Sequence, residues 1–188
     1  MNNHKKIRAI NRLDRDTSGI VLFAKNEYIQ ERMIKGTKME KEYIAFIAGV
    51  LKNKVGTINL PIKRKNGSIM EREVSEEGQT AITHYEVLKE VNLKNHTMTF
   101  SNKKEQSLIS IVKLQLETGR THQIRVHMAY CGTPILGDTL YGKVTSLISR
   151  QALHAFYLKL KHPITEKWLD IIAPIPDDMK QIIKKNLS

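Results

Sequence analysis

Several residue types are scarce in this 188-residue chain, and each scarcity excludes a class of protein. The single cysteine, Cys131, has no partner for an internal disulfide, and no Cys/His cluster with zinc-site spacing is present. No apolar run approaches the ~20 residues that a membrane span needs, and the amino end lacks the apolar stretch of a secretory signal. Aromatic residues make up 6% of the chain, too few for a broad platform that stacks single strands. We therefore expect a soluble, cytoplasmic protein without a metal.

Acidic residues are scarce as well, and the shortage is concentrated. The chain has 31 Lys and Arg against 19 Asp and Glu, a net charge of +12 with histidine neutral. Two stretches, 43–70 and 139–165, contain no acidic residue. Lysines spread over a surface often serve only solubility. Two acid-free stretches in a chain this basic indicate instead a surface that meets phosphates, so the charge predicts a nucleic-acid partner.

The order of apolar and turn residues predicts an α+β fold, with short helices flanking a mixed, largely antiparallel sheet. Strands are predicted over 19–25, 41–50, 56–60, 80–91, 107–116, 153–160 and 168–172, and helices over 27–35, 122–130 and 177–187. A hairpin turn is expected at Asn66-Gly67, and a solvated loop over 92–105, where Lys and Asn are frequent. No repeat or linker divides the chain, so residues 1–188 are expected to form a single domain.

One motif that could carry chemistry is 12–19, Arg-Leu-Asp-Arg-Asp-Thr-Ser-Gly. Its first five residues hold two carboxylates and two guanidiniums. Charges this close cost electrostatic energy unless they pair, and the pattern suits one ionised carboxylate held in a semi-buried cleft. A surface turn with exchanging salt bridges, worth ~0–1 kcal/mol each, explains the same residues. The spacing alone leaves both interpretations open.

A second motif, 118–127, places Arg120, His122, Gln123, Arg125 and His127 in one short segment. We expect a phosphate site at the start of the helix found there. A metal site is disfavoured, because the two histidines are five residues apart with no carboxylate between them. A third segment, 137–144, nearly matches the phosphate-cradling pattern of nucleotide-binding loops. Val144 stands where a hydroxyl must bind magnesium, so no nucleotide cofactor is expected.

Taken together, these segments resemble the pseudouridine synthases of large-subunit ribosomal RNA, a family with an Arg-Leu-Asp motif. The matching segments, in the family's order, are 12–14 with 16–19, 41–45, 119–127, 132–138, 140–142, 153–155, 162–163 and 173–176. The likeness covers almost the whole chain. It implies the family's α+β catalytic domain and an isomerase that converts uridine to pseudouridine in structured RNA, ribosomal rather than transfer RNA, without a cofactor.

The resemblance also implies roles for individual residues. Asp14 stands at the family's essential aspartate, which attacks the flipped nucleotide. Tyr43 matches the tyrosine that packs on the uracil and helps to remove the C5 proton, and Arg125 matches the arginine that pairs with the aspartate. Substrate contacts are expected from the same motifs, from the apolar floor under the base and from the basic hairpin, and the residues are Arg12, Arg15, Thr17, Arg120, His122, Gln123, Leu153, Lys63, Arg64 and Lys65.

Two features depart from the family pattern. Asn11 stands where the family has a histidine before Arg-Leu-Asp, and asparagine can hydrogen-bond but cannot titrate. The family's catalytic domain also begins with a strand that carries a Lys-Pro-x-Gly signature, often after a small RNA-binding S4 domain, and neither precedes Arg12 here. An RNA-binding remnant of this fold, weak or inactive as a catalyst, is therefore the alternative expectation. A hydrolase that uses Asp14 and Asp138 is a third, supported only by the two acids.

Overall fold

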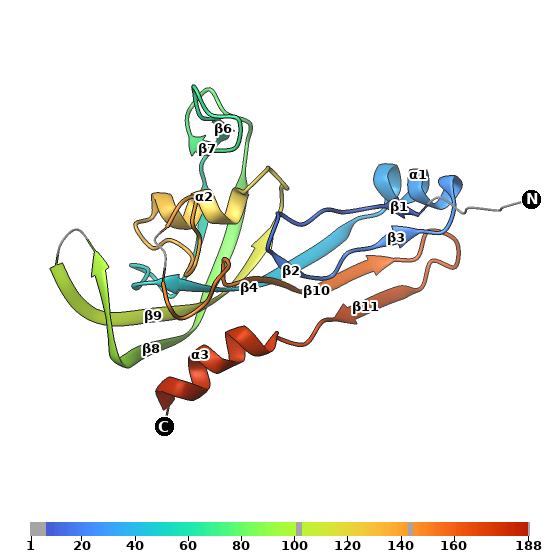
Figure 1. Ribbon diagram of the computed structural model, residues 1–188. Helices are drawn as coiled ribbons and strands as arrows, with labels where there is room; N and C mark the ends of the chain where they lie inside the picture. The colour runs from blue at the N-terminus through green and yellow to red at the C-terminus, as the bar shows by residue number, and fades with distance from the viewer. Residues whose placement is uncertain (1–6, 101–102, 143–144, 188) are drawn as a thin grey trace, which may run out of the picture.

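The computed structural model describes residues 7–100, 103–142 and 145–187. Its centre is a seven-stranded sheet (Figure 1), with the order β11, β10, β4, β9, β8, β5 from edge to edge and with β2 added to β10. Its pairings are antiparallel apart from that of β2 with β10. The strands are β2 (Ser18–Gly19), β4 (Met39–Ala48), β5 (Val55–Asn59), β8 (Ile82–Phe100), β9 (Lys103–Leu116), β10 (Leu153–Lys161) and β11 (Trp168–Ile172).

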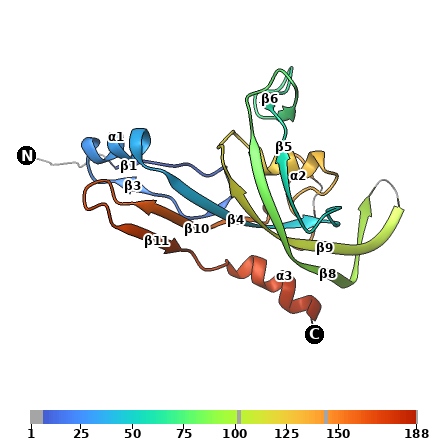
Figure 2. The same cartoon turned by 180° about the vertical axis from the view of Figure 1, so that it is seen from behind.

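Two short ladders and three helices surround this sheet. The ladders pair β1 (Arg8–Ala9) with β3 (Phe23–Ala24), and β6 (Ile62–Arg64) with β7 (Arg72–Val74). The helices are α1 (Glu27–Gly36), α2 (Gln123–Tyr130) and α3 (Asp177–Leu187). Figures 1 and 2 show α2 and α3 on opposite sides of the sheet and α1 beside β1 and β3 at one end. The predicted α+β class, with a largely antiparallel sheet and short helices, is confirmed.

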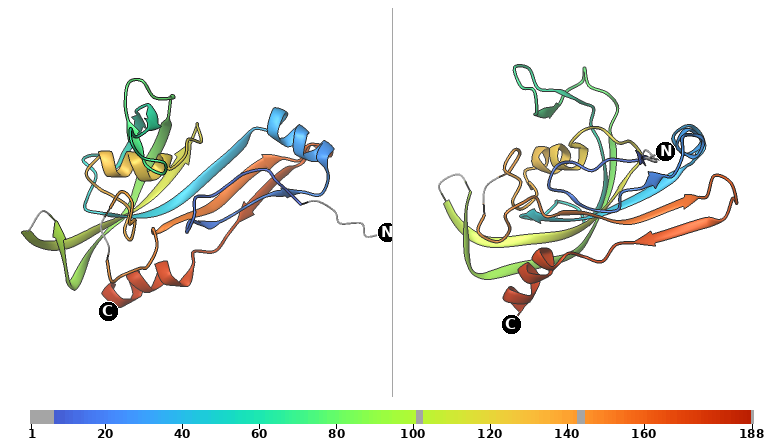
Figure 3. Two further views of the ribbon diagram at one scale, coloured as in Figure 1. Left: turned by 45° about the horizontal axis from the view of Figure 1, so that its top comes forward. Right: turned by 45° about the vertical axis from the view of Figure 1, so that its right-hand side comes forward.

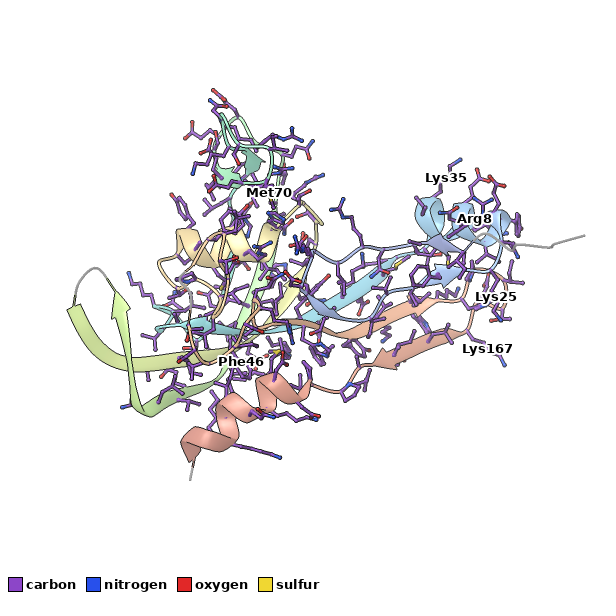
Figure 4. The ribbon with its side chains drawn as sticks, in the orientation of Figure 1. Arg8, Lys25, Lys35, Phe46, Met70 and Lys167 are labelled. Carbon is purple, nitrogen blue, oxygen red and sulfur yellow. The ribbon has the colours of Figure 1, made fainter. Side chains whose placement is uncertain are left out.

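Strand β4 runs through the centre of the fold because its sequence is apolar without alternation. Every residue from Tyr43 to Ala48 is buried, which requires cover on both faces of the sheet. Phe46, labelled near the middle of the molecule in Figure 4, and Ile47 point to opposite faces. Buried side chains of α2 and α3 complete the same core cluster, and they are Ile124, Met128, Met179 and Ile182. This half of β4 is therefore held from both sides.

The helices lie within one residue of their predicted ends. Asn26 caps α1, since its Oδ1 accepts the N–H of Ile29 at 2.9 Å. Gly132 closes α2 with a φ of +76°, and its N–H donates to the Ala129 carbonyl. Acidic residues occupy the first turn of α3, as the helix dipole favours. Along the described part of the chain, no helix is long and apolar enough to cross a membrane.

The solvated loop predicted over 92–105 is wrong. Strand β8 continues to Phe100 and β9 begins at Lys103, while 101–102 lie outside the described residues. Threonine and apolar residues alternate over 97–100, a pattern that suits strand pairing in spite of the nearby Lys and Asn. Leu93 is buried, so the hairpin starts from the core and extends outward.

The buried strand predicted over 19–25 is also wrong. The segment contributes only to the short strands β2 and β3, and Val21 and Phe23 are exposed. The Asn11 side chain explains the interruption. Its amide donates to the Ile20 carbonyl at 3.1 Å and accepts the N–H of Leu22 at 2.8 Å. A side chain therefore bonds backbone groups that a neighbouring strand would otherwise pair.

Candidate active site

The loop between β1 and β2 carries Asp14, and residues far along the chain hold it in place. The N–H of Thr17 donates to the Asp14 carbonyl at 3.0 Å, which closes a turn. Gln151 Nε2 donates to the Arg15 carbonyl and to Thr17 Oγ1, and Arg150 Nη1 donates to the next carbonyl at 3.3 Å. Both of these side chains directly precede β10, the strand that β2 pairs with. The loop therefore takes its shape from contacts across 134 to 136 positions of sequence.

A cavity of about 340 Å³ opens beside this loop, between β4 and residues 116–124. Asp14 lies on its wall with 18% of the side chain exposed. Lys41 and Tyr43 reach it from alternate positions of β4, and the buried Leu153 lines it from β10. Its volume falls within the range of small-molecule sites, roughly 300–1,000 Å³. The cavity therefore has room for one nucleobase beside the carboxylate.

Arg125, on α2, joins two carboxylates. Its Nε and Nη2 donate to the two oxygens of Asp138 at 2.7 and 2.8 Å, and its Nη1 lies 3.8 Å from Oδ2 of Asp14. Burial alone would raise the pKa of Asp138, but the hydrogen bonds and charge of Arg125 outweigh it, and the pKa is lowered. Burial alone would lower the pKa of Arg125, but the hydrogen bonds and charge of Asp138 outweigh burial, and the pKa of Arg125 is raised. Asp138 thus fixes a charged guanidinium whose remaining nitrogen faces Asp14.

Tyr141 links this cluster to the β6–β7 hairpin. Its ring centroid lies 5.1 Å from the guanidinium carbon of Arg125, a cation–π contact. Its hydroxyl accepts the N–H of Arg72 at 2.7 Å and shares a hydrogen bond of 2.9 Å with Nδ1 of His122. Burial lowers the pKa of His122, and the charge of Asp14 offsets this only in part. His122 is therefore neutral at pH 7 and tied to Tyr141.

Tyr43 is buried against the cavity with its phenol protonated. Burial, and second the charge of Asp14, raises its pKa to about 12. Burial also lowers the pKa of its neighbour Lys41. A protonated phenol donates a hydrogen bond, and its ring offers a flat apolar face to a bound base.

Five of the residues predicted to bind substrate line the cavity, and they are Arg12, Thr17, Arg120, Gln123 and Leu153. The amide of Gln123 is already fully engaged. It donates to the Ile82 carbonyl and Thr83 Oγ1, and it accepts from the N–H of Arg120 and the hydroxyl of Thr118, all within 3.0 Å. This buried amide fixes the start of α2.

The other predicted substrate contacts lie outside the cavity. The Arg15 side chain is 91% exposed and 3.7 Å from Asp16. His122 is bonded to Tyr141. The remaining three residues, Lys63, Arg64 and Lys65, belong to the β6–β7 hairpin and the turn after β6.

That hairpin adjoins the cavity through a second hollow of about 410 Å³, whose lining shares Arg120 with the first. The predicted turn at Asn66-Gly67 is confirmed, since the N–H of Ser68 donates to the Lys65 carbonyl and Gly67 has a φ of +76°. Lys63 pairs with Glu77 at 2.8 Å and Lys65 with Glu71 at 3.1 Å. Arg64 is exposed, and no acid of the described chain lies within ion-pair distance of it.

Sequence reasoning missed Asp138 as the partner of Arg125. The sequence presented Asp138 as part of a family segment, as a possible hydrolase acid and within a nucleotide-binding pattern, whose decisive Val144 lies outside the described residues. Asp14 and Asp138 do approach one guanidinium, but Asp138 is fully buried and also accepts two backbone N–H groups. A hydrolase with two carboxylates would need both to reach the substrate, and in the described structure Asp138 is not accessible. Among the described residues, no group of His, Cys, Asp and Glu could hold a metal ion.

Comparison with known proteins assigns the family. Residues 1–130 match the family model described as RNA pseudouridylate synthase. The chain belongs to the RNA pseudouridylate synthase family. It is 43% identical over 186 residues to YhcT of Bacillus subtilis, named an uncharacterized RNA pseudouridine synthase. It is 38% identical over 190 residues to the ribosomal large subunit pseudouridine synthase D of Vibrio cholerae. These alignments cover 97% and 92% of this chain but 57% and 54% of the relatives, so the chain spans little more than half their length.

Solved structures of RNA pseudouridylate synthase domains share the fold. Human RNA pseudouridylate synthase domain containing 1 superposes with a TM-score of 0.71, covering 98% of this chain and 82% of that one at 24% identity. Human RNA pseudouridylate synthase domain containing 4 gives 0.69 at 22% identity, covering 96% and 76%. The pseudouridine synthase-like architecture implied by the sequence motifs is confirmed.

Proposed function

We propose that this chain isomerises uridine to pseudouridine in structured RNA and that Asp14 is the nucleophile. Family membership and a net charge of +12 support an RNA substrate, and the name of the Vibrio relative favours ribosomal over transfer RNA. One observation carries the proposal. The Asp14 carboxylate lies on the wall of a cavity with room for a base, 3.8 Å from a guanidinium that a buried acid fixes.

The reaction needs little beyond these groups. The bond between N1 and C1′ breaks, the base turns, and C5 bonds to C1′. The C5 hydrogen leaves as a proton and N1 gains one, so nothing is oxidised or reduced. A carboxylate that adds to the nucleotide and leaves again divides the step into two easier ones. In this proposal Arg125 attracts and orients the charge of Asp14, and no cofactor is required.

Tyr43 would hold the flipped base. Taking a base out of its stack costs a few kcal/mol, and stacking on an aromatic ring returns ~1–3 kcal/mol. With a pKa of about 12 the phenol is protonated at neutral pH. It can accept the C5 proton only if it passes its own proton on in the same step. Packing and hydrogen bonding are therefore the first roles that we assign to Tyr43.

Tritium release from RNA that carries 5-tritiated uridine tests the nucleophile. The RNA is bulk RNA from a strain that lacks the gene. Asp14→Asn should abolish release, because an amide does not add to the nucleotide. Asp16→Asn is the matched control, since it changes an exposed acid in the same loop and should leave release near the wild-type rate.

Three outcomes are informative. Full release by Asp14→Asn would show that Asp14 is not the nucleophile. RNA binding without release by the wild-type chain would identify an RNA-binding module instead of an enzyme. If Arg125→Ala reduced binding as much as turnover, Arg125 would be a phosphate contact and not the partner of Asp14.

A further inference from the structure

A third hollow, of about 620 Å³, lies between α1 and the turn that joins β10 to β11. We call it the α1 groove. Tyr28, Arg32 and Lys35 line it from one face of α1, with the spacing i, i+4, i+7. Trp168, the only tryptophan of the chain, lines it from the start of β11. Figure 4 labels Lys35 and Lys167 at this end of the molecule.

The α1 groove contains two exposed aromatic rings, each beside a cation. Tyr28 is 56% and Trp168 is 54% exposed. The guanidinium carbon of Arg32 lies 5.7 Å from the Tyr28 centroid, and Nζ of Lys159 lies 5.2 Å from the Trp168 centroid. These contacts hold rings that are otherwise open to solvent. Exposed rings with polar surroundings suit a planar, polar ligand.

The charge of the α1 groove is positive once its internal pairs are removed. Its two acids are neutralised by lysines that lie 2.6 and 3.2 Å away. Arg32 and Lys38 have no acid of the described chain within ion-pair distance. Arg32 Nη1 donates to the Tyr28 hydroxyl at 2.9 Å, which positions its charge at the groove. Flat rings and cations that no acid neutralises are the two features that bind single-stranded nucleic acid, the rings by stacking and the cations at phosphates.

The α1 groove and the proposed catalytic cavity are lined by consecutive residues of the chain. Lys38 lines the groove, and the next residue, Met39, lines the cavity. Figure 3 shows β4 running from the α1 end into the middle of the fold. At ~3.3 Å per strand residue, the distance along β4 from Lys38 to Tyr43 is about 16 Å. A few unpaired nucleotides span that distance.

We propose that the α1 groove is a second RNA site, which binds an unpaired nucleotide flanking the target uridine. Its base stacks on Trp168, and its phosphates contact Arg32 and Lys38. This inference rests on the proposed function, because the nucleotide belongs to the same RNA. The low aromatic content excludes a broad platform but is sufficient for a site of one nucleotide.

The intrinsic fluorescence of Trp168 can report binding at the α1 groove, because Trp168 is the only tryptophan of the chain. Titration with single-stranded oligouridylate should quench it to saturation. The double variant Arg32→Gln/Lys38→Gln should bind more weakly, and its salt slope should fall by about 0.7 for each lost phosphate contact of a single strand. Lys52→Gln/Lys89→Gln removes the same charge elsewhere and is the matched control. Equal losses in both double variants, or no quenching at all, would overturn the proposal.

Kinetics provides a second readout. Trp168→Ala should raise KM for tritium release from bulk RNA by about tenfold for the lost stacking contact, with kcat unchanged. Tyr28→Ala removes the ring that holds Arg32 and should raise KM by a smaller factor, again with kcat unchanged. Tyr130→Ala changes an exposed tyrosine of α2 and should have no effect on KM. An unchanged KM in both groove variants would refute the groove while leaving the enzyme intact. Absence of release from the wild-type chain would refute the proposed function, and quenching by oligouridylate would still test the groove.

Discussion

At the scale of residues, Asp138 fixes the geometry of the site, although its own side chain is fully buried. Its two oxygens bind Nε and Nη2 of Arg125, which leaves Nη1 directed at Asp14. A bidentate pair fixes both the position and the plane of the guanidinium. The orientation of Asp14 therefore depends on a carboxylate that the substrate does not reach.

Removing that carboxylate should damage both folding and turnover. Asp138→Ala leaves a buried guanidinium without its partner, a change that typically costs ~3–5 kcal/mol. We expect a loss of this size in the free energy of unfolding measured in urea, together with loss of tritium release. Asp177→Ala, an exposed acid in the first turn of α3, should cost less than about 1 kcal/mol of stability and leave tritium release unchanged. Unaltered stability in Asp138→Ala would contradict the view that the pair is buried and essential.

The same carboxylate predicts a pH dependence of stability. Because the folded-state pKa of Asp138 lies below its ordinary value of 3.8, its contribution is complete above that value and is lost as the pH falls through the lowered pKa. The free energy of unfolding of the wild-type chain, measured in urea, should therefore decrease at acid pH below about 4. Asp138→Asn should lack this part of the decline. Parallel curves for the two proteins would contradict the assignment.

Gln151 acts on Asp14, the proposed nucleophile, through the backbone of the Asp14 loop. Its amide holds the Arg15 carbonyl and Thr17 Oγ1, so it is a positioning residue and not a catalytic one. Gln151→Ala should lower kcat while KM changes little, because the substrate contacts remain. Gln181→Ala on the surface of α3 is the control. A rise in KM at constant kcat would instead indicate direct contact with RNA.

At the scale of elements, the three cations of the β6–β7 hairpin differ in whether an acid pairs with them. Lys63 and Lys65 pair with glutamates of the same region, and Arg64 does not. We expect replacement of all three by glutamine to flatten the salt dependence of RNA binding. Among the single variants, Arg64→Gln should reduce the salt dependence of RNA binding the most. An unchanged slope in the triple variant would remove this hairpin from the RNA interface.

Prediction from sequence succeeded for elements with local causes. The Asn26 cap, Gly132 and the acidic start of α3 gave the helix ends, because each acts within one turn. Interactions between distant residues were not predictable. The Asn11 amide that interrupts 19–25 and the Gln151 clamp on the loop both depend on the assembled fold. The motifs marked Asp14, Tyr43 and Arg125 as candidates, while the anchoring of Arg125 by Asp138 needed the structure.

At the scale of the whole molecule, most of the proposed RNA contacts lie on one side of the sheet, and Trp168 lies at its β11 edge, on the face that also carries Lys159 and Lys161. Figures 1 and 2 show α1, α2 and the β6–β7 hairpin on that side and α3 on the other. Bulk RNA should therefore protect Lys38 from acetylation, as measured by mass spectrometry, while Lys180 of α3 stays reactive. Equal protection of both lysines would indicate binding by net charge alone.

The pairing of β2 with β10 also sets the order in which this molecule can assemble. Ser18 and Gly19 pair with His154 and Ala155, so a loop of more than 130 residues must close before Asp14 reaches its position in the fold. Contacts this distant in sequence form late in folding. During synthesis, Asp14 leaves the ribosome early but remains unplaced until the segment at 150–155 follows. A growing chain that still lacks this segment carries Asp14 without the geometry that the proposed reaction requires, so the proposed activity would appear only in this late step.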